Sequence, residues 1–163
     1  MSEDEIYQRT LAKILDFISN RARTVFEVER KLDKLIVGDV VKINRNIKAG
    51  IMEKLSQLKL LNDSQYAKDY LNEKINSSRP VGSGAIKKFL YRKGVSSELI
   101  KDIVSDFSAK DENEAIEKLL DHKMRTITKR DLKTKNKIIR FLLYRGFSSN
   151  AVFTAVDTKF EVK

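Results

Sequence analysis

The sequence predicts an all-α protein made of three tandem three-helix repeats, arranged as an elongated, curved right-handed-type helical array. Three observations support this fold class. Apolar residues recur at steps of three and four along most of the chain, which places them on one face of a helix. The 163 residues include one proline and six glycines, too few for a disordered chain or a turn-rich β protein. A set of residues also recurs at one fixed spacing in the second half of the chain.

The first predicted repeat, residues 1–62, contains three apolar stripes. Thr24 followed by Glu27 is a capping box, which marks the start of its second helix. We expect an irregular insertion at about residues 35–48, where the glycine stop of the other repeats should fall. The stripes are Ile6, Thr10, Ile14, Phe17 and Ile18; Val25, Val28 and Leu32; and Ile51, Leu55, Leu58 and Leu61.

The second predicted repeat, residues 63–109, opens at Asp63 after a turn. A loop is expected at residues 77–84, which hold the only proline and two glycines. Gly94 suits the left-handed position that ends a helix. Ser96 or Ser97 then caps the next helix. The stripes are Tyr66, Ala67, Tyr70, Leu71 and Ile75; Ile86, Phe89 and Leu90; and Leu99, Ile100, Ile103 and Val104.

The third predicted repeat, residues 110–163, has the same plan. Asp111 opens its first helix, Gly146 ends its second, and Ser148 or Ser149 caps its third. The stripes are Ala115, Ile116, Leu119 and Leu120; Ile138, Phe141 and Leu142; and Val152, Phe153 and Val156.

The second and third groups share residues at a constant offset of 52 positions. Both glycine stops are among the five identities, which favours a true repeat over chance. Repeats of this kind bury apolar faces partly within a unit and partly against neighbours. The matches are Phe89, Leu90, Gly94, Ser96 and Ser97 with Phe141, Leu142, Gly146, Ser148 and Ser149.

The composition limits the cell compartment and the kind of partner. The formal net charge is +10, which suits nucleic acid, an acidic protein face or anionic lipid. There is no cysteine, so disulfides and thiolate metal sites are excluded and a reducing cytoplasm is permitted. No apolar run reaches the roughly 18–20 residues of a spanning helix, and the start of the chain is acidic. We therefore expect a cytoplasmic protein that does not bind membranes.

A search of the sequence for an active site finds little. His122 is the only histidine, and we interpret it as a plain surface residue. No P-loop pattern or H-E-x-x-H motif occurs. Gly82 and Gly84 lack the lysine spacing of a phosphate-binding loop, so a flexible inter-helix loop is expected there. We predict a protein with no catalytic residues, no metal and no cofactor.

A basic segment, residues 123–145, carries nine lysines and arginines against Asp131 alone. It is either a solvated helix face or a docking surface for phosphates or acidic side chains. Solvated helix faces usually carry both positive and negative side chains, so we favour a docking surface. A second basic cluster lies about one repeat earlier. The predicted partner-binding or nucleic-acid-binding residues are Lys87, Lys88, Arg92, Lys93, Lys129, Arg130, Lys133, Lys135, Lys137, Arg140 and Arg145.

Aromatic residues are interleaved with these cations. Phe89 and Phe141 fall on apolar stripes and are expected in the core. For Tyr91 and Tyr144 we favour packing at a repeat junction, with base stacking as the alternative.

Four motifs follow one another in a set order and spacing over nearly the whole chain. They are Arg23, Thr24, Glu27, Lys31 and Leu32; residues 61–68 (LNDSQYAK); Gly82, Ile86, Leu90, Lys93, Gly94 and Val95; and Lys135, Lys137, Ile138, Phe141, Leu142, Arg145, Gly146 and Phe147. Together they resemble the RecX family, in which the second motif looks like the stretch that joins the first two repeats. Ser83 departs from the family pattern, which often has proline there.

The resemblance implies three three-helix repeats and a non-enzymatic role in homologous recombination, DNA repair and the SOS response. It implies binding in the groove of the RecA–DNA filament, with inhibition of filament growth, strand exchange and ATP hydrolysis. The expected partners are the RecA filament and single-stranded DNA, directly or within the filament, and the chain is expected to be a monomer. The alternative is a helical DNA-binding protein that acts alone through its basic face.

Overall fold

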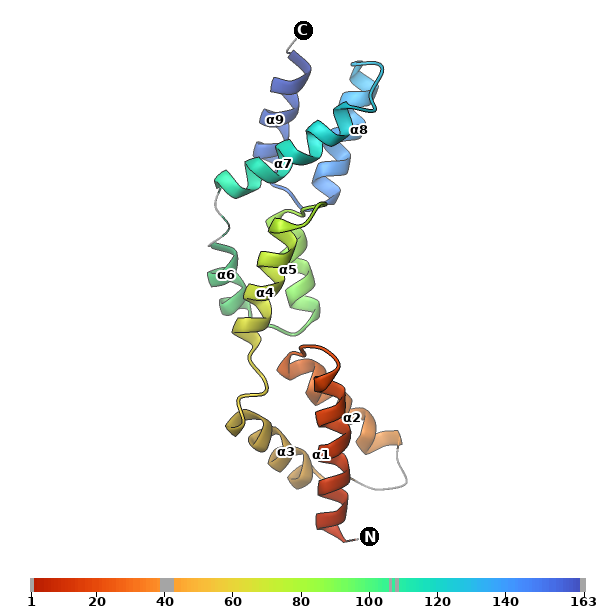
Figure 1. The fold of residues 1–163 in the computed structure, drawn as a ribbon, viewed down its shortest axis with the longest axis vertical. Coiled ribbons are helices and arrows are strands. Elements are labelled where there is room, and N and C mark those ends of the chain that lie inside the picture. The colour runs from red at the N-terminus through yellow and green to blue at the C-terminus, as the bar shows by residue number, and fades with distance from the viewer. Residues whose placement is uncertain (1, 39–42, 106, 108, 162–163) are drawn as a thin grey trace. The chain divides into compact units, whose positions relative to one another are not determined.

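The computed structural model describes residues 2–38, 43–105, 107 and 109–161, and every regular element among them is an α-helix (Figure 1). The all-α class and the three-helix groups are therefore confirmed. The helices of the described residues are α1 (Glu3–Ser19), α2 (Val25–Gly38), α3 (Arg45–Gln57), α4 (Asp63–Asn76), α5 (Ser83–Arg92), α6 (Ser97–Ser105), α7 (Ala109–Met124), α8 (Leu132–Tyr144) and α9 (Ser149–Glu161).

The chain packs as two units. Unit 1 comprises Met1–Tyr66 with the short segment Lys93–Val95, and unit 2 comprises Ala67–Arg92 with Ser96–Lys163. Helices α1 to α3 thus lie in unit 1, and α5 to α9 lie in unit 2. The division into repeats 1–62, 63–109 and 110–163 stays a prediction.

Unit 1 is built on local caps and one apolar core. The predicted capping box at α2 is confirmed: the Glu27 amide donates to Thr24 Oγ1 (3.2 Å), and the Thr24 amide donates to Glu27 Oε2 (3.3 Å). Helix α1 packs against both α2 and α3. Burying one Leu or Ile side chain stabilises the fold by about 1.5–3 kcal/mol. The core residues are Ile14, Val28, Leu32, Ile43, Ile47, Ile51 and Leu55.

The expected irregular insertion at residues 35–48 is wrong at both of its ends. Helix α2 continues to Gly38, and α3 already begins at Arg45. Asn44 supplies the missing start signal, because its side chain accepts a hydrogen bond from the Ile47 amide (2.8 Å). Ile47 then extends the buried stripe of α3 one turn earlier than predicted. Residues 39–42 lie outside the described residues.

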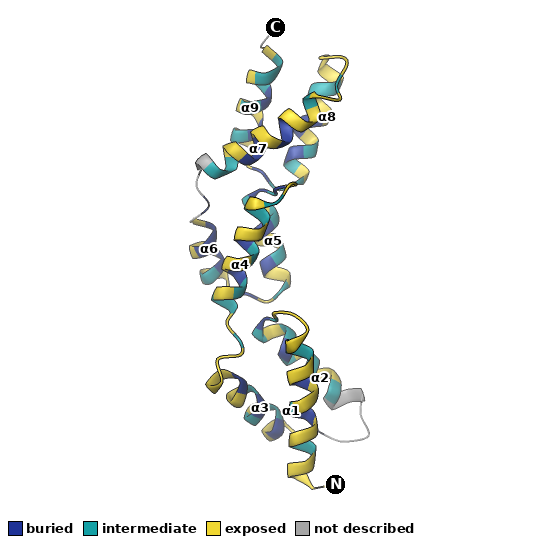
Figure 2. Cartoon of the chain, viewed as in Figure 1, coloured by how far each residue is buried: buried dark blue, intermediate teal, exposed yellow. Residues whose placement is uncertain are grey.

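Buried residues recur between exposed ones along the helices of unit 2 (Figure 2). In the first part of the unit, Ala67, Leu71, Ile86 and Leu90 are buried, and Tyr70 stacks on Phe89 with ring centroids 3.9 Å apart. Helices α7 to α9 share a second core. Its buried residues are Ala115, Ile116, Leu119, Leu120, Ile138, Ile139, Leu142, Phe147, Val152 and Val156.

The start of α5 joins the end of α8 inside unit 2. The Gly82 amide donates to the Arg145 carbonyl (3.0 Å), and the Gly84 amide donates to the Gly146 carbonyl (2.9 Å). The first amides and last carbonyls of a helix lack partners within it, so each helix end satisfies the other. The expected flexible loop at residues 82–84 is therefore wrong: α5 begins at Ser83, and the glycines allow two backbones to touch.

The predicted serine cap is present at α6, whereas the serine that precedes α9 binds a carboxylate of α7. Ser96 Oγ accepts from the Leu99 amide (3.3 Å), as predicted. Ser148 precedes α9, but its hydroxyl donates to Glu112 Oε2 (2.8 Å) and its amide donates to Glu112 Oε1 (2.9 Å). Glu112 of α7 thereby ties the start of α9 to its own helix.

Replacing Gly146 with alanine tests the α8–α5 junction. Gly146 has φ of 84°, and a Cβ there would lie 2.2 Å from the Ala85 amide nitrogen, so backbone must move. The left-handed conformation alone costs a non-glycine residue about 1–2 kcal/mol, and we expect a total loss above that. Urea denaturation measures it.

The control is Gly50→Ala in α3, where a Cβ would make ordinary contact with Tyr7 (3.4 Å). This change should stabilise the protein by up to about 1 kcal/mol, because alanine favours helix over glycine. An unchanged stability for Gly146→Ala would refute the proposed role of the junction.

Candidate partner-binding surface

Helix α8 carries a stripe of exposed cations that ends in an exposed tyrosine. Lys133, Lys137, Arg140 and Tyr144 follow one another at steps of four, three and four, which places them on one side of the helix. All four are exposed, while Ile138 of the same helix is buried. We call these four residues the α8 stripe. It presents three positive charges to solvent along roughly 16 Å of helix.

Helix α5 has a similar but shorter exposed face. Lys87, Lys88, Tyr91 and Arg92 are exposed, and the Arg92 guanidinium lies 6.0 Å from the centre of the Phe89 ring. Both faces lie in unit 2.

Seven of the eleven predicted site residues are exposed and form no ion pair within the described part of the chain. Their charges are therefore available to a partner. They are Lys87, Lys88, Arg92, Lys129, Lys133, Lys137 and Arg140.

The other four predicted residues bind within the protein. Lys135 Nζ lies 2.8 Å from Asp157 Oδ1, and Arg130 Nη1 donates to the Lys159 carbonyl (3.3 Å). Lys93 pairs with Glu27, and Arg145 donates to two backbone carbonyls, as described below. The role of these four residues in partner binding stays a prediction.

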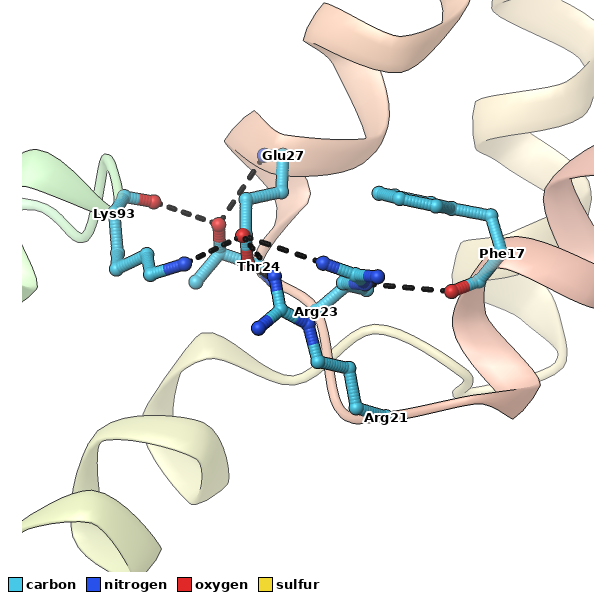
Figure 3. Close-up of polar contacts among 6 residues, drawn as sticks. All are labelled: Phe17, Arg21, Arg23, Thr24, Glu27 and Lys93. Atoms are coloured by element: carbon cyan, nitrogen blue, oxygen red, sulfur yellow. Dashed lines mark hydrogen bonds and ion pairs between the residues drawn. The ribbon is translucent and has the colours of Figure 1, made fainter.

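Lys93 belongs to a polar cluster around Glu27 (Figure 3). Its ammonium lies 2.6 Å from Glu27 Oε1, and its carbonyl accepts from Thr24 Oγ1 (2.6 Å). Arg23 and Arg21 approach the same carboxylate at 3.7 and 3.6 Å. Thr24 is fully buried, so the cluster joins the Lys93–Val95 segment to the start of α2 within unit 1.

Two carboxylates near the start of α2 have opposite pKa shifts. Burial raises the pKa of Glu27, but hydrogen bonds from Lys93 and the Thr24 amide, with the charges of Lys93 and Arg23, outweigh it and lower that pKa. Burial raises the pKa of Asp63, whose Oδ1 accepts from the Val25 amide (2.9 Å), and the charge of Glu27 adds to the rise. Sequence alone does not indicate these two pairings, because Lys93 and Asp63 lie far along the chain from the start of α2.

Arg145 braces the loop before α5. Its Nε donates to the Pro80 carbonyl (3.0 Å) and its Nη2 to the Arg79 carbonyl (2.6 Å). Burial, and then the charge of Arg79, lowers the pKa of Arg145. Arg145 is equivalent to Lys93 in the repeat, and both side chains bind groups inside the protein.

A pocket of about 440 Å³ lies beside the α8 stripe, at the turn between α7 and α8. Two predicted site residues, Lys129 and Lys137, line it together with Lys123 and Asp131. Asp131 caps α8 by accepting from the Thr134 amide (2.8 Å), and hydrogen bonds from Thr134 lower its pKa. The stripe is thus continuous with a hollow that has more positive than negative charge.

The packing predicted for Tyr91 and Tyr144 is wrong. Tyr91 is 54% exposed and Tyr144 is 92% exposed. Each lies outside the buried stripe of its helix, which runs through Leu90 in α5 and Leu142 in α8. Both aromatic rings are accessible beside exposed cations.

No group of three or more histidine, cysteine or acidic side chains is placed among the described residues to hold a metal ion. None of the described helices combines the length and apolar character needed to cross a bilayer.

The helices and the exposed face define an all-α protein of three-helix repeats with a basic surface. A family model described as RecX, third three-helix domain, matches residues 110–156. The regulatory protein RecX of Clostridium acetobutylicum is 32% identical over 151 residues, which cover 90% of this chain and 66% of that protein. That of Clostridium perfringens (strain 13) is 35% identical over 99 residues, or 59% of this chain and 45% of the relative.

The solved structures agree with this class. The crystal structure of RecX from Lactobacillus salivarius matches with a TM-score of 0.73 and 26% identity, and the match covers 98% of this chain and 99% of that one. This chain belongs to the RecX family. It spans 66% and 45% of the two clostridial relatives, which are named regulatory proteins.

Replacing Asp63 with asparagine should make unit 1 more sensitive to acid. A lowered Glu27 pKa contributes stability at neutral pH that is lost as the pH falls through the folded-state pKa. The raised Asp63 pKa acts in the opposite direction: protonation of Asp63 at low pH increases the stability of the folded state and offsets part of that loss. Asp63→Asn removes the offset, so stability should fall more steeply between about pH 6 and pH 3. Thermal unfolding at a series of pH values measures the slope.

Glu27→Gln is the matched control. It should lower stability at neutral pH and flatten the acid slope, because the favourable carboxylate is gone. Equal slopes in both variants and the parent would contradict these two assignments.

Proposed function

We propose that this chain binds the RecA recombinase filament and inhibits its extension, ATP hydrolysis and strand exchange. The proposal places the chain, as a non-enzymatic monomer of the cytoplasm, in homologous recombination, DNA repair and the SOS response. Membership of the RecX family supports it. The single observation that carries it is the α8 stripe, whose three cations are exposed and have no ion pair within the described part of the chain.

The stripe suits a partner that presents acidic side chains or phosphates in a row. Charges at the edge of an interface mainly raise the rate of association and are screened by salt. A filament repeats the same surface many times, so contacts with more than one subunit would add up to tight binding. The cations of α5 would extend the same contact.

Direct binding to single-stranded DNA is a second candidate function. The exposure of Tyr91 and Tyr144 beside cations favours it. Stacking of one base on an aromatic side chain contributes about 1–3 kcal/mol and needs no particular sequence. Such binding would not require RecA, and it would show a steep dependence on salt.

Charge reversal in the α8 stripe tests the first candidate. Lys137→Glu/Arg140→Glu should weaken binding to a RecA–ATP filament on single-stranded DNA by at least about tenfold, since two attractive contacts become repulsive. The RecA ATPase rate should recover in parallel. Filament binding is measured by fluorescence anisotropy at two salt concentrations.

The matched control is Lys68→Glu/Lys101→Glu, which makes the same change of charge on α4 and α6 at exposed positions of unit 2. It should bind nearly as the parent does. Equal effects of the two double variants would show that net charge alone matters and would count against a specific surface.

Binding to bare single-stranded DNA, compared with binding to the filament, distinguishes the two candidate functions. Tighter binding to the filament than to DNA, with a fall in ATPase rate, supports the regulator. Equal binding to bare DNA, lost in Tyr91→Ala/Tyr144→Ala and without effect on the ATPase, supports the stand-alone DNA-binding protein.

A further inference from the structure

A second pocket, of about 400 Å³, lies in unit 2 beside the loop before α5. Helices α7 and α8 form its other walls. This volume is within the range of sites that hold small ligands. The lining residues are Ser78, Arg79, Leu119, His122, Lys123, Phe141 and Arg145.

The pocket gathers positive charge without an acidic side chain in its wall. Arg79, Lys123 and Arg145 carry three fixed charges, and His122 adds a nitrogen donor or acceptor. None of the four has a carboxylate at ion-pair distance in the part of the chain that the structure describes. Like charges held together repel, so the arrangement is stabilised by an anion placed among them.

The walls of this pocket are fixed by contacts inside the protein. Arg145 is held by the carbonyls of Arg79 and Pro80, and burial with the nearby charge of Arg79 lowers its pKa. Lys118 Nζ donates to the Ser77 carbonyl (3.1 Å), which ties the loop to α7. Arg145 is thus already held in place, whereas the exposed side chains of Arg79 and Lys123 lose conformational freedom when they bind an anion.

Phe141 forms an apolar wall beneath two of the cations. The Lys123 ammonium lies 4.7 Å and the Arg145 guanidinium 5.5 Å from the centre of its ring. The aromatic face orients both cations, and the half-buried Arg145 attracts an anion more strongly than a fully solvated cation would.

The charge of the pocket distinguishes among phosphate ligands. A phosphodiester strand brings about one negative charge per nucleotide. A terminal phosphate alone carries roughly −1.5 to −2 near neutral pH, so a chain of two or three phosphates brings roughly three or more charges into a small volume. Only the chain of two or three phosphates matches three permanently charged side chains in a volume of about 400 Å³.

We propose that this pocket binds the di- or triphosphate group of a small molecule, with Arg79, Lys123 and Arg145 as the cationic ligands and His122 as a further hydrogen-bonding group. The source is either a nucleoside di- or triphosphate or inorganic pyrophosphate. The inference goes beyond the proposed function and does not depend on it. Sequence alone pointed to a plain surface role for His122, because Arg79 and Arg145 are far from it along the chain.

Isothermal titration of the full chain tests the site with pyrophosphate and with ADP, at constant ionic strength and without divalent metal. Arg79→Gln/Lys123→Gln should weaken binding by at least about tenfold, because two charge-assisted contacts are lost. The control Lys68→Gln/Lys101→Gln removes two exposed charges outside the pocket and outside the α8 stripe, and should bind within about twofold of the parent. Circular dichroism checks that both variants fold.

The probes also identify the source of the phosphates. Equal affinity for pyrophosphate and ADP assigns the site to the phosphate chain alone, and tighter binding of ADP assigns it to a nucleotide. Both outcomes support the proposal. Binding no tighter than that of sulfate, binding that both double variants weaken equally, or binding of oligothymidine but not of pyrophosphate overturns it.

Discussion

The pairing of backbone groups between the start of α5 and the end of α8 is the contact on which the rest of unit 2 depends. Gly82 and Gly84 donate to carbonyls at residues 145 and 146, and no side chain lies between the two backbones. This contact fixes the end of the α8 stripe relative to α5. It also holds Arg145 against the loop that walls the phosphate pocket. Both candidate binding features therefore rest on one junction.

The glycine equivalent to Gly146 in the preceding repeat has a related role in unit 1. Gly94, with φ of 75°, faces Phe26, and the carbonyl before it accepts from Thr24. The basic residue before each glycine, Lys93 or Arg145, binds a neighbour inside the protein. The charge repeated at this position therefore has a structural role. The cations of the α8 stripe remain exposed, and among them only Arg140 has a basic counterpart, Lys88, at the offset of 52.

Local signals in the sequence were sufficient to predict the helices but not the contacts between residues far apart in the chain. Apolar spacing and caps such as Thr24 and Ser96 identified the elements, because both depend on neighbours within a few residues. Asn44 could have been recognised as a cap in the same way. The links of Lys93 to Glu27 and of Ser148 to Glu112 could not, since they join residues that only the fold brings together. The same limit hid the pocket around His122.

The α8–α5 junction also constrains the order of events during synthesis. A chain is made from its N-terminus, and its earlier parts generally fold first. The amides of Gly82 and Gly84, however, find their acceptors only in residues 145 and 146. Until those residues leave the ribosome, the start of α5 has no partner from α8 and the loop before it has no arginine brace. The second predicted repeat, residues 63–109, therefore completes its packing only after most of the third, residues 110–163, has been made.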